Sequence, residues 1–187
     1  MIKFPSIEQF RTIVSNVLRH FNYVGLDETG EAIYDQTLSK PTLTFKGTVK
    51  LHGTNAGVSY NTNGGLWAQS RENIITVEKD NAGFAFFVDS NKDAFNQLFR
   101  KIQEETSVSF NDNTVTIFGE WCGGNIQKGV GISNLPKSFF IFGIKISPIV
   151  ADEEEAKLKP AVWVDSSYLE LPDNKIYNIE SFQTYEI

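Results

Sequence analysis

Hydrophobic residues recur at helical spacing in two parts of the chain. From Ser6 to Phe21 one apolar stripe is formed by Ile7, Phe10, Ile13, Val14, Val17, Leu18 and Phe21. Ser6 and Gln9 stand where a capping box would close the first turn, so the pattern predicts an amphipathic N-terminal helix. After Ser90 a second helix is expected to pack on a sheet, because apolar residues follow i, i+3, i+4 and i+7 spacing at Phe95, Leu98, Phe99 and Ile102.

Most of the remaining chain shows the period of two that is typical of β-strands. Residues 43–51 and 56–60 alternate in this way on either side of a break, and Asn63-Gly64-Gly65 predicts a turn into a strand at 66–70. Further strands are expected at 114–121, 139–146, 162–164 and 175–179. The strands outnumber the helices and do not alternate with them regularly, which favours an α+β domain with antiparallel sheet. Without an internal repeat or a long linker, residues 1–187 are expected to form a single domain.

Composition and charge narrow the class of protein. The hydrophobic content of 41%, with 15 Phe, is enough for a core, and no apolar run reaches the roughly 20 residues of a membrane span. The N-terminus lacks a signal-peptide layout, so a cytoplasmic protein is expected. The single cysteine, Cys122, excludes an internal disulfide and a Cys-based zinc site, which leaves carboxylates and phosphates to hold a metal.

The net charge of -6 argues against a protein that grips nucleic acid with its whole surface, since such binding neutralises phosphates with Lys and Arg. Any contact with nucleic acid is therefore expected to be local. The acidic run Asp152–Glu155 predicts a solvated loop.

The segment 48–55 contains the residues with the clearest chemical meaning. Lys50 is expected at the end of a strand with its amine pointing away from the apolar layer, and Gly53 allows a tight turn beside it. A lysine in such a place is ordinarily a solvated side chain. To act as a nucleophile it must be neutral, which requires a nearby cation such as a metal ion, Lys46 or Arg71 to lower its pKa.

The sequence Lys-Leu-His-Gly-Thr-Asn at residues 50–55 resembles the nucleotidyl-lysine motif of the covalent nucleotidyltransferases, which include RNA ligases, DNA ligases and mRNA capping enzymes. Its His-Gly-Thr-Asn form is similar to the phage RNA ligase 2 branch. The resemblance implies an adenylation domain in which Lys50 takes AMP from ATP with the help of Mg²⁺. It also implies that His52, Gly53 and Asn55 help to hold the nucleotide.

Two further segments are similar to motifs of the same family. Ser70-Arg71-Glu72 resembles the second motif, whose arginine meets phosphate; the alternative is a surface arginine paired with Glu72 or Glu78. The strand that ends in Gly119-Glu120 resembles the third motif, whose glutamate the family uses at the ribose hydroxyl or the metal.

Residues 121–140 carry the last part of the resemblance. The Gly-rich stretch 123–129 is similar to that of the RNA ligase 2 type, and Gln127 would support the nucleotide or the RNA end. Phe140 resembles the aromatic residue that stacks on the nucleobase, with core packing as the alternative. In a strand Phe140 and Phe142 share one face, and Phe139 and Ile141 share the other.

The resemblance spans Phe45 to Ile146 and continues more weakly over Lys175–Ile187. Two later family motifs are missing before the C-terminus, so the sequence is expected to be the N-terminal part of a longer enzyme, impaired on its own. The implied activity is ATP-dependent joining of RNA 5′-phosphate and 3′-hydroxyl ends through lysyl-AMP, in a phage-like RNA repair enzyme that a virus could encode for the host cytoplasm. The alternatives are a non-catalytic nucleotide or RNA-end binding module and a DNA-ligase-like or capping-type nucleotidyltransferase.

Overall fold

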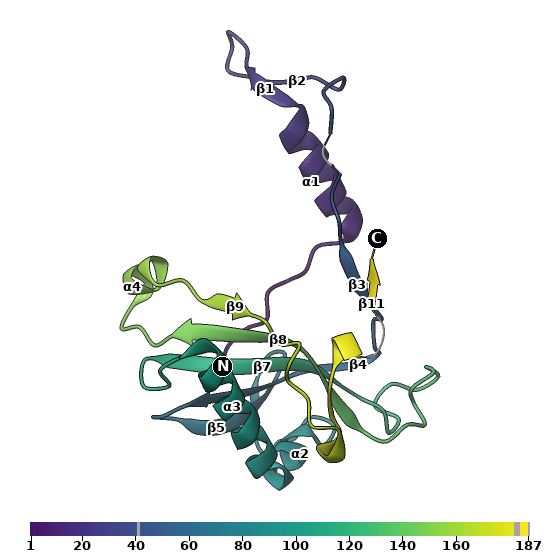
Figure 1. The fold of residues 1–187 in the computed structure, drawn as a ribbon, viewed down its shortest axis with the longest axis vertical. Coiled ribbons are helices and arrows are strands. Elements are labelled where there is room, and N and C mark those ends of the chain that lie inside the picture. The colour runs from purple at the N-terminus through teal and green to yellow at the C-terminus, as the bar shows by residue number, and fades with distance from the viewer. Residues whose placement is uncertain (41, 182–183, 187) are drawn as a thin grey trace. The chain divides into compact units, whose positions relative to one another are not determined.

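The computed structural model describes residues 1–40, 42–181 and 184–186 (Figure 1). The chain packs into two compact units. Unit 1 comprises Met1–Phe4 and the described part of Gly47–Tyr185, and unit 2 comprises the described part of Pro5–Lys46 with Glu186. That the whole chain acts as one adenylation domain stays a prediction. The last residues of the weaker resemblance, 182–183 and 187, lie outside the described residues.

Unit 1 is built on one seven-stranded sheet. Its strands are β4 (Gly53–Asn61), β5 (Gly65–Ser70), β6 (Ile74–Ile75), β7 (Asn113–Cys122), β8 (Ser138–Pro148), β9 (Val162–Val164) and β10 (Ile176–Asn178). They run in the order β10-β8-β7-β4-β5-β6, with β9 also paired to β8, and every pair is antiparallel except β10 with β8. The predicted α+β class with antiparallel sheet is confirmed. A separate two-stranded sheet joins β3 (Lys46–Thr48) and β11 (Thr184–Glu186).

The main core lies between this sheet and two helices, α2 (Phe84–Ser90) and α3 (Lys92–Thr106), which cover one of its faces (Figure 1). The helix expected after Ser90 is confirmed as α3, and it buries the four residues of its predicted stripe, Phe95, Leu98, Phe99 and Ile102. They pack with sheet residues such as Val58, Val115 and Ile117, all fully buried. Two short 3₁₀ turns, η1 (Pro172–Asn174) and η2 (Ile179–Ser181), flank β10.

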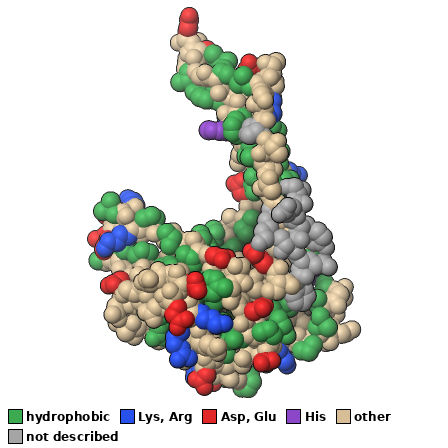
Figure 2. Space-filling view, viewed as in Figure 1, with side chains coloured by type: hydrophobic (Ala, Val, Ile, Leu, Met, Phe, Trp, Pro, Cys, Tyr) green, Lys and Arg blue, Asp and Glu red, His purple; other side chains and the backbone are tan. Residues whose placement is uncertain are grey.

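Unit 2 consists of α1 (Phe10–Asn22) followed by the hairpin strands β1 (Tyr23–Leu26) and β2 (Ala32–Tyr34). The amphipathic helix is confirmed, but the capping box at Ser6 and Gln9 is wrong. The helix starts at Phe10 with Gln9 as N-cap, and the Gln9 side chain makes no capping hydrogen bond. The apolar stripe stays at the surface, with Phe10 54% and Leu18 39% exposed, and Figure 2 shows hydrophobic side chains on the surface of this unit.

The strand expected to end at Lys50 is wrong in its extent. β3 ends at Thr48 and β4 begins at Gly53, so residues 49–52 form a loop. The alternation at 43–51 does not reflect burial, because Leu43 and Val49 are both exposed while only Leu51 is buried. Periodicity alone therefore misassigned this segment.

The acidic run at 152–155 is solvent-exposed for the most part but is not a loop. It opens the helix α4 (Glu153–Leu158), whose N-cap is Asp152. The Asp152 carboxylate accepts a hydrogen bond of 2.9 Å from the Glu155 N–H, and acidic residues in a first turn are favoured by the helix dipole. Capping thus converts the expected loop into a short helix.

Candidate active site

Four side chains from four neighbouring strands form a row across the sheet. Glu120 on β7 pairs directly with Asn55 on β4 and with Phe140 on β8, and Phe140 pairs with Tyr177 on β10. Directly paired residues lie on the same face, and the next residue along β7, Trp121, belongs to the core under α2 and α3. This site row, defined as Asn55, Glu120, Phe140 and Tyr177, therefore lies on the sheet face away from the helices.

A β-bulge fixes the register of the row. The pairing of β7 with β8 shifts between Phe118 and Gly119, so that Phe142 has no direct partner on β7. Because of this shift, Glu120 comes to lie opposite Phe140. Bulges commonly redirect side chains next to functional sites.

The predicted division of the β8 phenylalanines is confirmed. Phe139 and Ile141 are in the main core, whereas Phe140 and Phe142 pack in a second, smaller cluster on the other face. The ring of Phe4 packs edge-on against Phe142, with the ring centroids 5.1 Å apart. The two faces of β8 thus contribute to different parts of the molecule.

The loop that carries Lys50 is anchored at Gly53. The Gly53 N–H donates a hydrogen bond of 2.8 Å to Oε1 of Glu120, and Nε2 of Gln127 donates one of 3.3 Å to the Gly53 carbonyl. A Cβ at Gly53 would lie 2.2 Å from the Trp121 carbonyl oxygen and could not be accommodated. A glycine is therefore required where the loop meets β7.

The charge of Glu120 is balanced by the same loop. Burial raises the pKa of the Glu120 carboxyl above its ordinary value, while the Gly53 N–H and the charges of Lys50 and His52 act in the opposite direction. Lys50 and His52 are exposed, and both are close enough to Glu120 to act on it electrostatically. The loop thus brings two basic side chains to a half-buried carboxylate.

An apolar pocket of about 290 Å³ opens beside the row. The rings of Phe140 and Tyr177 stack in its wall with centroids 5.3 Å apart and an interplanar angle of 24°. It is lined by Leu51, Cys122, Gly123, Ile132, Leu135, Pro136, Ser138, Phe140, Lys175 and Tyr177. We call this hollow the row pocket. Its volume is just below the roughly 300–1,000 Å³ that small-molecule sites occupy.

The wall of the row pocket also contains the single cysteine. Cys122 is 2% exposed, and burial, with a smaller contribution from the charge of Glu120, raises the pKa of its thiol to about 12. The thiol is therefore protonated at neutral pH and behaves as a small apolar side chain.

Arg71 is an expected site residue whose side chain pairs at the surface and not with the site row. Its side chain is 72% exposed, and its Nε lies 3.5 Å from a carboxylate oxygen of Glu72. This is the surface pairing named above as the alternative to a phosphate contact. Ser70, the last residue of β5, pairs with Ala56, which follows Asn55 of the site row on β4. Arg71 comes directly after Ser70, so its backbone nevertheless lies near the end of the site row.

The other expected residues are gathered on or beside the row: Lys50, His52, Gly53, Asn55, Glu120, Gln127 and Phe140. Sequence reasoning missed Tyr177 and Lys175 as part of the same site. The expected strand at 175–179 and the weaker resemblance over 175–187 pointed to this segment without giving it a place in the site, because the parallel pairing of β10 with β8 joins segments distant in sequence. Among the described residues, no group of three or more His, Cys, Asp or Glu could hold a metal ion.

The sheet, the covering helices and a lysine loop anchored on a strand-borne glutamate are compatible with the nucleotidyltransferase class of protein. The chain matches the RNA ligase family over residues 44–171, which is more than half of its length. The chain therefore belongs to the RNA ligase family. The matched span contains Lys50, Arg71, Glu120 and Phe140. Among curated proteins, none matches the chain significantly. None of the described helices has the length and apolar character that crossing a membrane requires.

Proposed function

We propose that the chain is an ATP-dependent RNA ligase of the RNA ligase 2 type, with Lys50 as the residue that becomes AMP-modified. The observation that carries the proposal is the hydrogen bond from the Gly53 N–H to Glu120. It fixes the Lys50 loop to the row that also bears Asn55 and Phe140. Family membership supports ligase chemistry for this arrangement.

In the first step the neutral amine of Lys50 attacks the α-phosphorus of ATP. A P–N bond forms, the P–O bond to pyrophosphate breaks, and the amine proton is released. The adenine would enter the row pocket and meet Phe140, where stacking contributes about 1–3 kcal/mol. Glu120 would accept a hydrogen bond from a ribose hydroxyl at Oε2, since the Gly53 N–H is bonded to Oε1 and the side chain is half-buried.

The remaining side chains suit the phosphates and the RNA end. His52 is exposed beside Lys50, Asn55 lies next to Glu120, and Gln127 is held by the Gly53 carbonyl. In the second step a 5′-phosphate oxygen of RNA attacks the phosphorus of lysyl-AMP and breaks the P–N bond, which frees Lys50. In the third step a 3′-hydroxyl attacks the 5′-phosphate, a phosphodiester forms, and AMP leaves.

Mg²⁺ fits this set of donors. The ion is ordinarily bound by one or two carboxylates together with substrate phosphates and water, not by a cage of protein ligands. Glu120 offers such a carboxylate beside the loop that carries Lys50. When bound, Mg²⁺ neutralises phosphate charge and favours the neutral form of a nearby lysine.

A second candidate function is a nucleotide or RNA-end binding module without turnover. It is favoured by the position of Arg71, whose guanidinium pairs with Glu72 and not with a group of the site row. Phosphoryl transfer depends largely on positioning and on neutralising the transferred charge. A chain with fewer cations at the phosphates would bind ATP and stop there.

The two candidates separate in one label-transfer experiment. The chain is incubated with α-labelled ATP and Mg²⁺, and protein-bound label is followed on a denaturing gel before and after addition of 5′-phosphorylated RNA. The ligase proposal expects label on the chain, its transfer to RNA, and no label on Lys50→Ala. Lys157→Ala on the exposed helix α4 is the matched control and should behave like the parent chain. ATP binding without bound label would favour the binding module.

A further inference from the structure

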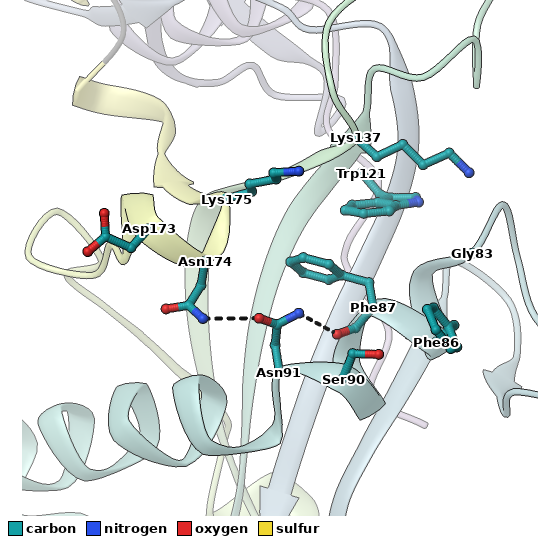
Figure 3. A pocket seen from close by; sticks show the side chains of 10 residues that line it. All are labelled: Gly83, Phe86, Phe87, Ser90, Asn91, Trp121, Lys137, Asp173, Asn174 and Lys175. Atoms are coloured by element: carbon teal, nitrogen blue, oxygen red, sulfur yellow. Dashed lines mark hydrogen bonds between the residues drawn. The ribbon is translucent and has the colours of Figure 1, made fainter.

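A second hollow, of about 470 Å³, opens beside α2 and η1. Figure 3 shows Lys137 and Lys175 at one rim, above the rings of Trp121 and Phe87, with Ser90 and Asn91 on the opposite side. Trp121 belongs to the sheet face that α2 and α3 cover, so we call this hollow the helix-side pocket. The site row does not use it.

Lys137 is held in place at the rim. Its ammonium donates a hydrogen bond of 2.7 Å to the Ala82 carbonyl, which also accepts one of 3.1 Å from the indole N–H of Trp121. Its stem fills the space above Gly124, where a Cβ would lie 2.5 Å from the Lys137 Cγ. An ammonium has three donors, so Lys137 keeps donors for a further acceptor. A positioned cation of this kind suits a phosphate.

Aromatic side chains form the wall below the lysines. The rings of Phe87 and Trp121 lie 4.6 Å apart, and this pair gives the wall a fixed surface. Phe86 is 61% exposed at the edge of the pocket and makes no part of the core. A large exposed aromatic beside a positioned cation is the combination that binds single-stranded nucleic acid, by stacking on the base and by charge on the backbone.

The opposite side of the pocket is polar and already ordered. Nδ2 of Asn174 donates a hydrogen bond of 3.1 Å to Oδ1 of Asn91, whose own Nδ2 donates one of 2.9 Å to the Phe87 carbonyl. The one carboxylate of the lining, Asp173, points away from Lys137 and Trp121 (Figure 3). The Asp173 carboxylate therefore does not lie between Lys137 and Lys175 (Figure 3), where a phosphate would bind.

We infer that the helix-side pocket binds one nucleotide of the RNA strand to be joined, with its base against the exposed ring of Phe86 and its phosphate on Lys137 and Lys175. Lys175 also lines the row pocket, so the two hollows adjoin at this residue. A strand whose end lies at the site row would reach the helix-side pocket along Lys175. The inference rests on the proposed ligase function and adds a contact for RNA outside the site row. It also reconciles RNA binding with a net charge of -6, because the contact is local.

The test uses the full chain and a 5′-phosphorylated single-stranded RNA that carries one photoreactive 5-iodouridine near its 5′ end. Binding is measured by fluorescence anisotropy at two salt concentrations, and crosslinked peptides are mapped by mass spectrometry. We expect a crosslink within residues 83–91. We expect Phe86→Ser to weaken binding roughly fivefold or more, since a stacked base is lost, and Lys137→Glu to weaken binding and flatten its salt dependence.

Two control variants at α4 make the same kinds of change, an apolar residue to Ser and a Lys to Glu, away from the helix-side pocket. Leu158→Ser removes an apolar side chain that is 83% exposed, and Lys157→Glu reverses the charge of a paired surface lysine. Both should bind RNA like the parent chain. Thermal unfolding of Phe86→Ser checks that a loss of binding is not a loss of fold, since Phe86 lies outside the core.

Label transfer from ATP to Lys50, measured in parallel, keeps the two proposals separate. Lys50 should be labelled equally in the parent chain, Phe86→Ser and Lys137→Glu if the helix-side pocket serves RNA alone. Unchanged RNA affinity in both variants, or crosslinks confined to segments outside residues 83–91, would overturn the inference and leave the ligase proposal standing. An unlabelled parent chain would instead count against the ligase proposal, whatever the RNA affinities show.

Discussion

The two faces of the seven-stranded sheet differ in how their side chains are used. The face under α2 and α3 is closed by apolar residues such as Phe95, Leu98 and Ile117, which are fully buried. The other face holds Glu120, a half-buried carboxylate supported by a main-chain N–H and two basic side chains. Strand β7 contributes to both faces, since its residues alternate between them. The core on one face thus stabilises the strands that position Glu120 and the rest of the site row on the other.

The largest expected effect is on the core face. Phe95→Ala should lower the free energy of unfolding by about 3–5 kcal/mol, because it leaves a cavity under α3. Urea unfolding followed by circular dichroism measures this loss. Phe86→Ala, on the neighbouring helix but 61% exposed, should change stability by less than about 1 kcal/mol. Equal losses of unfolding free energy in the two variants would contradict the difference in burial between Phe95 and Phe86.

The adjacent residues Phe139 and Phe140 allow the faces to be compared within one strand. Phe139→Leu and Phe140→Leu each remove part of a buried ring and should each cost roughly 1–3 kcal/mol of stability. Only Phe140→Leu should also weaken ATP binding, by roughly 5- to 150-fold, since stacking contributes about 1–3 kcal/mol. Isothermal titration calorimetry distinguishes them, and equal ATP affinities would remove Phe140 from the nucleotide site.

Glu120→Gln should separate charge from structure. The amide oxygen can still accept the Gly53 N–H, so the loop should stay anchored. Because burial raises the pKa of Glu120, the folded parent chain holds this proton to higher pH than the unfolded chain does, and its stability falls as pH rises through that interval. Glu120→Gln has no carboxyl group to titrate and therefore does not lose this stability. Relative to the parent chain, its free energy of unfolding should rise slightly at pH values above the pKa of the folded chain and should not rise below the pKa of the unfolded chain.

Lysine labelling by ATP should nevertheless fall roughly tenfold or more in Glu120→Gln, since a hydrogen bond to a charged group contributes about 1.5–3 kcal/mol. Thermal unfolding at several pH values and initial rates of labelling measure the two effects. A labelling rate equal to that of the parent chain would contradict the assignment of Glu120 to the site.

The smallest effect concerns Cys122. With its pKa raised to about 12 and its side chain 2% exposed, the thiol should react with iodoacetamide far more slowly in the folded chain than in urea. Raising the pH from 7 to 9 should speed labelling of the unfolded chain and leave the folded chain almost unchanged. Mass spectrometry measures the extent of alkylation. A rapid reaction of the folded chain would show that the row pocket opens readily.

The local elements were largely predictable from the sequence, and the contacts between distant segments were not. Periodicity located α3 and the strands of the main sheet other than β6, since burial on one face leaves a clear pattern. It misplaced the start of α1, where Gln9 and not Ser6 is the N-cap, and it missed α2 and the hairpin of β1 and β2. These elements are short, or their apolar residues are exposed, so their patterns carry little information.

The sequence motifs identified most residues of the candidate site, but they did not predict which of these residues lie next to one another. The register shift between Phe118 and Gly119 places Phe140 opposite Glu120, and no local sequence pattern predicts this shift. Tyr177 joins the row only through the parallel pairing of β10 with β8. Arg71 fits the motif by spacing, but its side-chain contact with Glu72 depends on the conformation of an exposed turn. Such details depend on tertiary packing.

The most direct test of the account is to locate the AMP group after reaction of the full chain with ATP and Mg²⁺. Tandem mass spectrometry of peptides prepared without exposure to acid, which hydrolyses a P–N bond, should place AMP on Lys50, with acid removing it and with no adduct in Lys50→Arg. AMP on another residue, or an adduct that persists in Lys50→Arg, would contradict the claim that the loop anchored by Gly53 and Glu120 carries the nucleophile.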